Sequence, residues 1–172
     1  MGGMPAVLRD FRPRELWVGI DPDSEAYRAL LAEAKELGVA VRHFHAGQDL
    51  NWGGTKVSVL APEADYRNTG APVNNDSLVM RLRYGKSSAL LEGDAEAPSE
   101  RAMMADGRMT SVTLLKVGHH GSKSSTTPEF FAEAAPKDAV ISVGKGNTFG
   151  HPKEEVIDRI AAAHTRLYRT DE

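Results

Sequence analysis

The sequence predicts an α+β fold, an αββα sandwich in which sheets are covered by helices on the outside. Its 172 residues, 41% hydrophobic and 26% charged, are enough for one globular domain with a buried core. Segments that read as paired strands come first, and strands that alternate with helices follow, as such layers require. We therefore expect residues 1–172 to belong to a single domain.

The N-terminal segments alternate between helix and strand. Residues 5–11 read as a short helix with proline in its first turn, and residues 15–20 as a compact apolar strand. Apolar residues recur at helical spacing over 25–37, where Asp23 or Ser24 can cap the first turn and a glycine follows the last one.

A run of strands comes next. Residues 39–44 and 55–62 are predicted strands on either side of a glycine-rich turn, and residues 63–72 are a predicted loop. Residues 77–85 and 87–93 read as a hairpin because a glycine-containing turn separates two apolar stretches. The remaining helices and strands are expected in alternation, at residues 97–104, 112–117, 128–134, 139–143, 153–163 and 166–169.

The composition restricts the possible chemistry. The net charge of −3 offers no general attraction for a polyanion, so nucleic-acid contact would depend on a local cluster or a metal. Cysteine is absent, which excludes disulfides, thiolate zinc sites and cysteine nucleophiles and leaves His, Asp, Glu or Asn as metal ligands. No apolar run approaches the ~18 residues of a membrane span, so we expect a soluble chain.

Reactive side chains stand where predicted strands end, which is where a layered α/β sheet places its ligands. Asp94 follows the strand at 87–93, and its carboxylate could bridge two metal ions or cap the next helix. His119 and His120 follow the strand at 112–117. Adjacent residues at a strand end point in different directions, so one imidazole can ligate a metal while the other contacts substrate.

Two further stretches offer groups for an anion. Ser122, Lys123 and Ser124 form a loop rich in hydrogen-bond donors directly after the two histidines. His151 precedes the predicted helix at 153–163, so its imidazole and the free N–H groups of the helix would lie together. The alternative is that His151 is an ordinary loop residue and the proline after it simply starts the helix.

The other histidines read as structural, and the sequence lacks the common catalytic motifs. His43 and His45 form an HxH pair, but they belong to a segment that reads as an exposed alternating strand, and we interpret them and His164 as structural. There is no Gly-x-Ser-x-Gly elbow, P-loop or recognisable carboxylate pair. Metal-assisted hydrolysis is the chemistry that best fits these residues.

Four segments together resemble the C-terminal metallo-β-lactamase-like domain of ComEC proteins, and the resemblance runs over essentially the whole chain. They are NNDSLVMRLRYG, SSALLEGDAE, LLKVGHHGSKSSTTPEFF and AVISVGKGNTFGHPKEEVIDRI. In that family an HxHxDH motif precedes a Gly-Gly-x-Pro-x-x-Leu helix. Because this sequence opens with GGMPAVL at residues 2–8, we expect a partial metallo-β-lactamase-like domain that starts just after the motif and is also incomplete at its C-terminus.

The resemblance implies a site for one or two divalent ions, zinc or manganese. Asp94 would be the bridging ligand, and His119 or His120 the later histidine ligand. Many members of the fold carry another histidine where this chain, like ComEC-like domains, has Asn74 and Asn75. An amide oxygen is a weak neutral ligand, so these two residues are expected to orient substrate or water.

The resemblance also implies a reaction: metal-activated hydroxide would attack a phosphodiester of single- or double-stranded DNA during competence-related DNA uptake. Ser122, Lys123 and His151 would hold phosphate oxygens or protonate the leaving oxygen, and Ser124 would contact substrate. The membrane channel part of the same polypeptide is the implied partner, with this domain tethered on the extracytoplasmic side. Without the HxHxDH segment, too few ligands remain, so we expect weak metal binding and little activity.

Two alternatives remain open. The fold could hydrolyse another phosphoester or ester, such as phosphorylcholine, because related hydrolases also carry a His-His-Gly element. The chain could instead be a non-catalytic binding or structural remnant.

Overall fold

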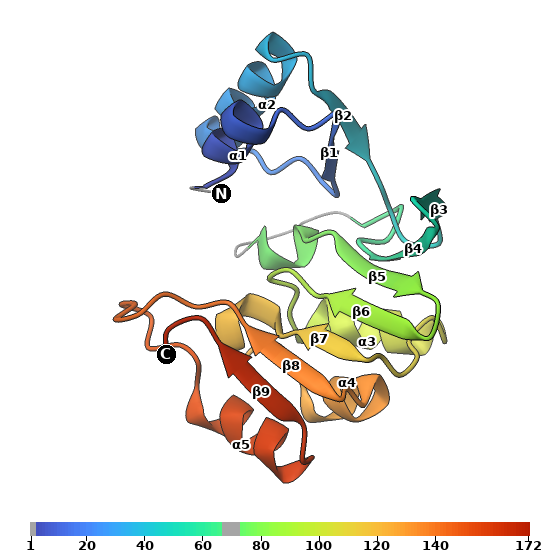
Figure 1. Cartoon of the computed structure of the whole chain (residues 1–172), viewed down its shortest axis with the longest axis vertical. Helices are drawn as coiled ribbons and strands as arrows, with labels where there is room; N and C mark the ends of the chain where they lie inside the picture. Colours follow the sequence, from blue (N-terminus) through green and yellow to red (C-terminus); the bar gives the residue numbers. More distant parts are fainter. Residues whose placement is uncertain (1–2, 67–72) are drawn as a thin grey trace. The chain divides into compact units, whose positions relative to one another are not determined.

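The computed structural model describes residues 3–66 and 73–172, and the chain divides into two compact units, Met1–Phe44 and His45–Glu172 (Figure 1). The first unit contains two helices and two parallel strands, α1 (Met4–Phe11), β1 (Glu15–Val18), α2 (Glu25–Glu36) and β2 (Ala40–His43). The Ser24 Oγ caps α2 by accepting a hydrogen bond from the Tyr27 N–H at 3.2 Å. Leu8, Leu16 and Leu30 are buried between the helices and strands.

The second unit is built on a seven-stranded sheet in the order β3-β4-β5-β6-β7-β8-β9. Neighbours from β3 to β6 are antiparallel, and neighbours from β6 to β9 are parallel. The strands are β3 (Asp49–Trp52), β4 (Thr55–Ala61), β5 (Val79–Tyr84), β6 (Ser87–Leu91), β7 (Leu114–Lys116), β8 (Asp138–Ile141) and β9 (Arg166–Arg169).

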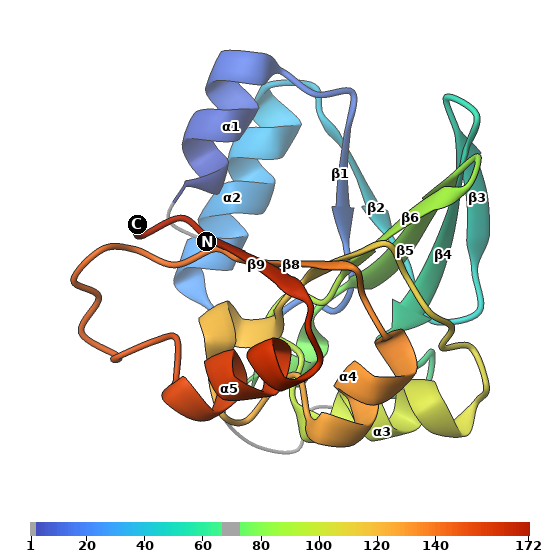
Figure 2. The ribbon, with the colours of Figure 1, turned by 60° about the horizontal axis from the view of Figure 1, so that its bottom comes forward.

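Helices cover one face of this sheet (Figure 2). They are α3 (Ala97–Ala105), α4 (Pro128–Ala134) and α5 (Glu154–Ala162), and two short 3₁₀ turns, η1 (Val73–Asp76) and η2 (Gly118–Gly121), complete the unit. Apolar side chains from strands and helices meet in one core, whose fully buried members include Leu90, Leu115, Ile141, Met103, Phe130 and Ile160. Burial of this apolar surface is what fixes the helices on the sheet.

Most predicted helices and strands are present, with bounds one to three residues shorter or shifted. β3 is the exception, because the sequence analysis predicted no strand there. It pairs with β4 across Gly53 and Gly54, a two-residue hairpin turn. Its residues are mostly exposed and polar, so it lacks the apolar alternation that marks a strand. Part of the predicted loop at 63–72 lies outside the described residues.

The parallel half of the sheet positions the reactive loops. β6, β7 and β8 run side by side in the same direction, so their C-terminal ends share one edge. β6 leads to Asp94, β7 to His119 and His120, and β8 to the loop that contains His151. No helix in the described part of the chain is long and apolar enough to cross a membrane.

Candidate functional site

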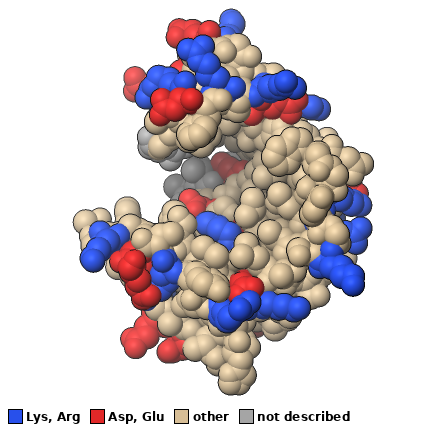
Figure 3. All heavy atoms as spheres, viewed as in Figure 1, with Lys and Arg blue, Asp and Glu red and all other residues tan. Residues whose placement is uncertain are grey.

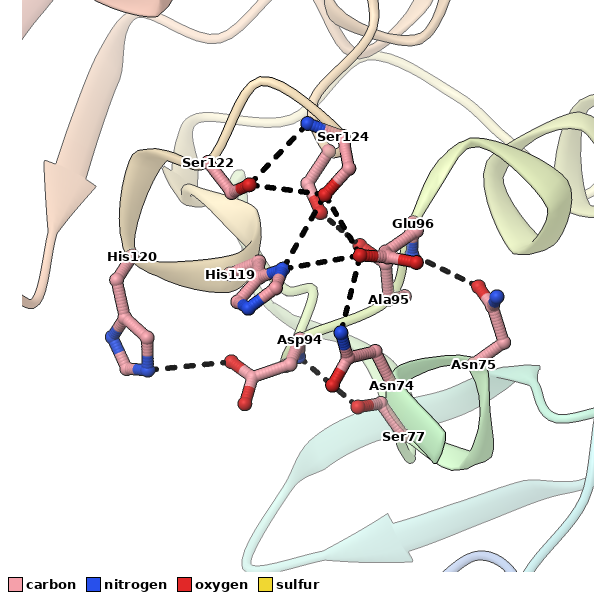
Figure 4. A network of polar contacts seen from close by, with 12 residues as sticks. Asn74, Asn75, Ser77, Asp94, Ala95, Glu96, His119, His120, Ser122 and Ser124 are labelled. Atoms are coloured by element: carbon pink, nitrogen blue, oxygen red, sulfur yellow. Dashed lines mark hydrogen bonds and ion pairs between the residues drawn. The ribbon is translucent and has the colours of Figure 1, made fainter. Parts of the chain in front are cut away.

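Asp94 and three histidines, His119, His120 and His151, lie in one cluster at that edge of the sheet. The Asp94 Oδ1 is 3.5 Å from the His120 Nε2 (Figure 4). The ring of His119 lies 6.3 Å from that of His120 and 5.7 Å from that of His151, measured between centroids. Side chains from three loops that are distant in the sequence therefore face a common region.

Backbone hydrogen bonds fix Asp94 on the turn after β6. Its N–H donates to the Ser77 Oγ at 3.0 Å. The carbonyl oxygen of Gly93 accepts from the Lys116 Nζ at 2.9 Å and from the His119 N–H at 3.0 Å. The Asp94 turn and the histidine loop are thus held to each other. Glu96, and not Asp94, occupies the N-cap position of α3, so the capping role is not the one that Asp94 plays.

His119 and His120 both adopt left-handed backbone conformations, with φ of 44° and 57°. Such values are uncommon outside glycine and persist only where the surroundings enforce them. They direct the two rings to different partners. The His120 Nδ1 lies 2.6 Å from the Ser142 carbonyl oxygen, which can only accept, so Nδ1 carries a proton and Nε2 is the nitrogen that faces Asp94.

Glu96 is a residue of this cluster that the sequence analysis missed. Its Oε1 lies 3.3 Å from the His119 Nδ1 and accepts hydrogen bonds from the Ser124 Oγ at 2.7 Å and the Asn74 Nδ2 at 3.1 Å. Its N–H donates to the Asn75 Oδ1 at 3.0 Å. Both asparagine amides, predicted to orient substrate, therefore contact Glu96 in this structure (Figure 4). Nothing in the sequence marked Glu96 beyond its place two residues after Asp94.

The predicted phosphate-binding loop is only partly accessible. The Ser122 side chain is buried and its Oγ lies 3.0 Å from that of Ser124. The Ser124 Oγ is also 3.5 Å from the His119 Nδ1. Lys123 is exposed, and among the described residues it makes no hydrogen bond or ion pair. Among the described residues, the loop thus has one unpaired charged group, the Lys123 ammonium. It also has the Ser122 and Ser124 hydroxyls, which contact each other, and Ser124 contacts His119.

His151 has an environment that favours its neutral form. Burial lowers its pKa, and the positive charges of Lys153, His119 and His120 lower it further. Its Nδ1 is buried and has no hydrogen-bond partner in the part of the chain that the structure describes. The backbone of the loop is fixed by Asn147, whose Oδ1 accepts from the His151 N–H at 3.0 Å. An uncharged imidazole with an unused buried nitrogen therefore borders the cluster.

Two buried carboxyl groups, those of Glu92 and Glu100, accept hydrogen bonds from the histidine loop and from the residues that follow it. The Glu92 Oε2 accepts from the Gly118 N–H and from the Thr126 hydroxyl, each at 2.9 Å. Glu100 accepts from the Thr127 N–H at 2.9 Å and from the Thr126 N–H. Burial raises the pKa of Glu92 well above its usual value, and the neighbouring Glu100 carboxylate raises it further. Glu92 is therefore the partner that keeps its proton.

This arrangement predicts an unusual pH dependence of stability. Above pH 4.5, the ordinary pKa of a glutamate, the unfolded chain releases the Glu92 proton whereas the folded chain retains it. Stability from this group is thus fully present below pH 4.5 and is lost as pH rises towards the higher folded pKa. Glu92→Gln removes the ionisation but keeps the shape of the side chain.

We expect the unfolding free energy of the wild type, measured relative to that of Glu92→Gln, to fall as pH increases from 4.5. Urea denaturation of both proteins at a series of pH values on either side of that point measures the difference. A difference that stays constant with pH would show that Glu92 ionises normally in the fold.

The donor set of the cluster suits a metal ion but supplies only part of a site. A carboxylate and an imidazole nitrogen are ligands that zinc and manganese accept. The Asp94 carboxylate and the His120 Nε2 face each other, and the hydrogen bond to Ser142 orients the imidazole as in known metal sites. Among the described residues, no three His, Asp or Glu side chains come close enough together to hold an ion.

The remaining histidines have contacts elsewhere. His43 pairs through its Nε2 with the Asp21 Oδ1 at 2.7 Å, and the His45 Nδ1 lies 2.9 Å from the Ala46 carbonyl oxygen. His164 follows α5 with a φ of 55°. Each of these residues has a local structural contact or turn position that accounts for it.

Comparison with curated proteins finds relatives among competence proteins, although no protein-family model matches the sequence. The chain is 38% identical over 143 residues to ComE operon protein 3 of Bacillus subtilis, which covers 83% of the chain and 18% of that protein. It is 35% identical to Recombination protein 2 of Haemophilus influenzae over 73% of the chain and 16% of the relative. Competence protein ComA of Neisseria gonorrhoeae is 33% identical over 90% of the chain and 21% of the relative. The chain thus spans a small fraction of these proteins.

Solved structures with the same fold share little sequence with the chain. The metallo-β-lactamase fold protein YhfI from Bacillus subtilis matches with a TM-score of 0.55 and 11% identity, over 98% of this chain and 68% of that one. CmlA, a diiron β-hydroxylase from Streptomyces venezuelae, matches with a TM-score of 0.55 and 12% identity, over 90% of this chain and 38% of that one. These neighbours confirm the predicted α+β, metallo-β-lactamase-like fold class.

Proposed function

This chain belongs to the metallo-β-lactamase-fold domains of ComEC-type competence proteins, and from that we propose that it takes part in metal-dependent hydrolysis of DNA phosphodiesters during DNA uptake. The observation that carries the proposal is the pairing of Asp94 with an oriented His120 at the end of two parallel strands. The approach of the His120 Nε2 to the Asp94 carboxylate at 3.5 Å favours His120 over His119 as the ligand.

Asp94 and His120 would hold a divalent ion, zinc or manganese, and the further ligands would come from outside the described residues. Such an ion supplies an activated water as nucleophile and offsets negative charge on the phosphate. These two proposed ligands among the described residues are fewer than the three or four that a catalytic site needs. For this chain by itself we therefore propose weak metal binding and slow hydrolysis.

The other residues of the cluster would bind and orient the phosphate. A neutral His151 always keeps one N–H, which can donate to a phosphate oxygen, and its lowered pKa maintains that form. Lys123, exposed beside the cluster, would pair with the phosphate charge. Contacts with Glu96 fix the orientations of the His119 and Ser124 side chains, so both would meet the substrate in one defined orientation.

We further propose that the intact protein attaches this domain to a membrane channel formed by the same polypeptide and places it on the extracytoplasmic side. What supports this is that its competence-protein relatives are several times longer, with the chain spanning 18%, 16% and 21% of three of them.

Asp94→Asn tests the metal role because it keeps the size of the side chain and removes its charge. We expect it to weaken manganese binding about 10- to 100-fold, measured by isothermal titration, and to lower manganese-dependent cleavage of labelled single-stranded DNA by a similar factor. Asp158→Asn is the matched control, since Asp158 is an exposed residue of α5 outside the cluster.

Equal manganese affinity for the wild type and Asp94→Asn would contradict the proposed ligand. Metal binding that depends on Asp94, together with cleavage of a phosphomonoester or phosphorylcholine but not of DNA, would retain the metal site and overturn the DNA substrate.

A further inference from the structure

A polar pocket opens on the antiparallel half of the sheet in the second unit. Its volume is about 380 Å³, and three basic side chains line it: Lys56 on β4, with Arg81 and Arg83 on β5. The rest of its lining is four hydroxyl-bearing residues, Ser58, Ser88, Thr110 and Ser111. Lys and Arg side chains are visible along this edge of the unit, where the β5–β6 hairpin lies (Figure 3).

The strand register explains why these charges meet. Lys56 is paired with Arg83, and Ser58 with Arg81, so the side chains of each pair project from the same face of the sheet. Arg83 is in turn paired with Ser88 on β6. Two like charges directly opposite each other destabilise a sheet unless an anion lies between them. The strand register therefore places Lys56 opposite Arg83, and a bound anion would reduce the repulsion between their positive charges.

Internal partners neutralise only part of this charge. Lys56 forms an ion pair with Asp49 at 2.7 Å between Nζ and Oδ2. Arg81 donates to the Arg108 carbonyl oxygen at 3.2 Å and to the Thr110 hydroxyl, neither of which is charged. Arg83 makes no ion pair or hydrogen bond within the described ranges. Among the described residues, the Asp49 carboxylate is thus the one acidic partner of these three basic side chains, and the Arg83 guanidinium is unpaired.

The pocket is separate from the Asp94 cluster. Ser88 lies near the start of β6, whereas Asp94 follows its end, six residues later. The extended part of the strand from Ser88 to Leu91 alone separates the two places by about 10 Å, at about 3.3 Å per residue. One phosphate group cannot contact both.

We propose that this pocket binds a backbone phosphate of a nucleic-acid strand, at a point remote from the bond that is cleaved. Guanidinium groups and hydroxyls are the groups that contact phosphates in nucleic-acid complexes, and such contacts set the position of the strand without reading its sequence. This deepens the proposed function and rests on it for the identity of the ligand. Because the net charge of the chain is negative, contact with DNA has to rest on a local basic cluster such as this one or on a metal.

Arg83→Gln tests the proposal, because Arg83 is exposed and no hydrogen bond or ion pair to another described residue is lost with it. Binding of a fluorescein-labelled single-stranded oligonucleotide is measured by anisotropy over a range of salt concentrations, in EDTA so that neither metal nor cleavage contributes. We expect Arg83→Gln to bind about 3- to 10-fold more weakly and to reduce the slope of log affinity against log salt by about 0.7. Lys56→Gln is expected to act in the same direction.

The matched control is Arg101→Gln, which removes the same charge from an exposed position on α3 and is expected to leave the salt slope unchanged. An identical affinity and slope for Arg83→Gln and Arg101→Gln would overturn the proposal, and so would a wild type that does not bind the oligonucleotide. Inorganic phosphate that binds as tightly as the oligonucleotide would show a small-anion site instead. Because only binding is measured, a failure of the hydrolytic proposal leaves this test intact.

Discussion

Replacing Glu100 by alanine is expected to lower the free energy of unfolding by about 3–5 kcal/mol. The Glu100 side chain is fully buried and accepts hydrogen bonds from the N–H groups of Thr126 and Thr127 and from the Thr127 hydroxyl. Alanine leaves the Thr127 N–H and hydroxyl without the Glu100 acceptor, and the Thr126 N–H keeps only the Glu92 Oε1 at 3.3 Å. It also removes the neighbouring carboxylate that raises the pKa of Glu92.

Urea denaturation monitored by circular dichroism measures this loss. Glu133→Ala, which removes an exposed glutamate from α4, is the control and is expected to change the unfolding free energy by less than about 0.5 kcal/mol. Glu100→Gln should lie between the two, because its amide keeps one acceptor but turns an NH₂ group towards donors. Glu100→Ala as stable as the control would mean that the buried carboxyl pair does not support the histidine loop.

Gly121→Ala is expected to be the second most damaging change, at about 2–4 kcal/mol. Gly121 has a φ of 82°, which costs energy for any residue with a side chain, and its added Cβ would lie 2.5 Å from the Pro152 Cβ. The proline ring cannot rotate away, so one of the two loops must move. The Gly121 carbonyl oxygen accepts from the Lys153 N–H at 2.8 Å, and this bond joins the histidine loop to the loop that carries His151.

Gly107→Ala is a control that introduces the backbone strain of a positive φ without a steric clash. Gly107 has a φ of 64°, but a Cβ there would meet no atom within 4 Å, so only about 1 kcal/mol is expected. Thermal denaturation of the two variants gives the comparison. If Gly121→Ala lost no more stability than Gly107→Ala, the contact with Pro152 would not constrain the two loops.

The sequence predicted the parts of the molecule that depend on local pattern. Apolar periodicity and glycine turns located the hairpin of β5 and β6 and the helix α4, whose bounds agree with the predicted residues. It missed β3, because a mostly exposed strand carries no apolar alternation. Strand-end position led us to expect Asp94, His119 and His120 at one edge of the sheet, whereas His151 was proposed from its place before the predicted helix at 153–163.

Contacts between distant segments could not be predicted in this way. The association of Glu96 with His119 depends on how the turn after β6 meets the loop after β7, and no residue spacing encodes it. The same is true of Glu92 and Glu100, which read as ordinary charged residues until the fold buries them against Thr126. The proposed preference for His120 over His119 likewise needed the contact between the His120 Nε2 and Asp94, which no residue spacing encodes.

The left-handed conformations of His119 and His120 have a consequence for how a cation would associate. Hydrogen bonds from the Gly118 N–H to the buried Glu92 carboxyl group and to the Thr126 hydroxyl hold the loop in this shape and so fix the directions of the two imidazoles. Little conformational freedom is left to lose at the moment of coordination. Under the proposed function, the loop would therefore be a preorganised half-site that needs no rearrangement when the remaining ligands complete the coordination sphere.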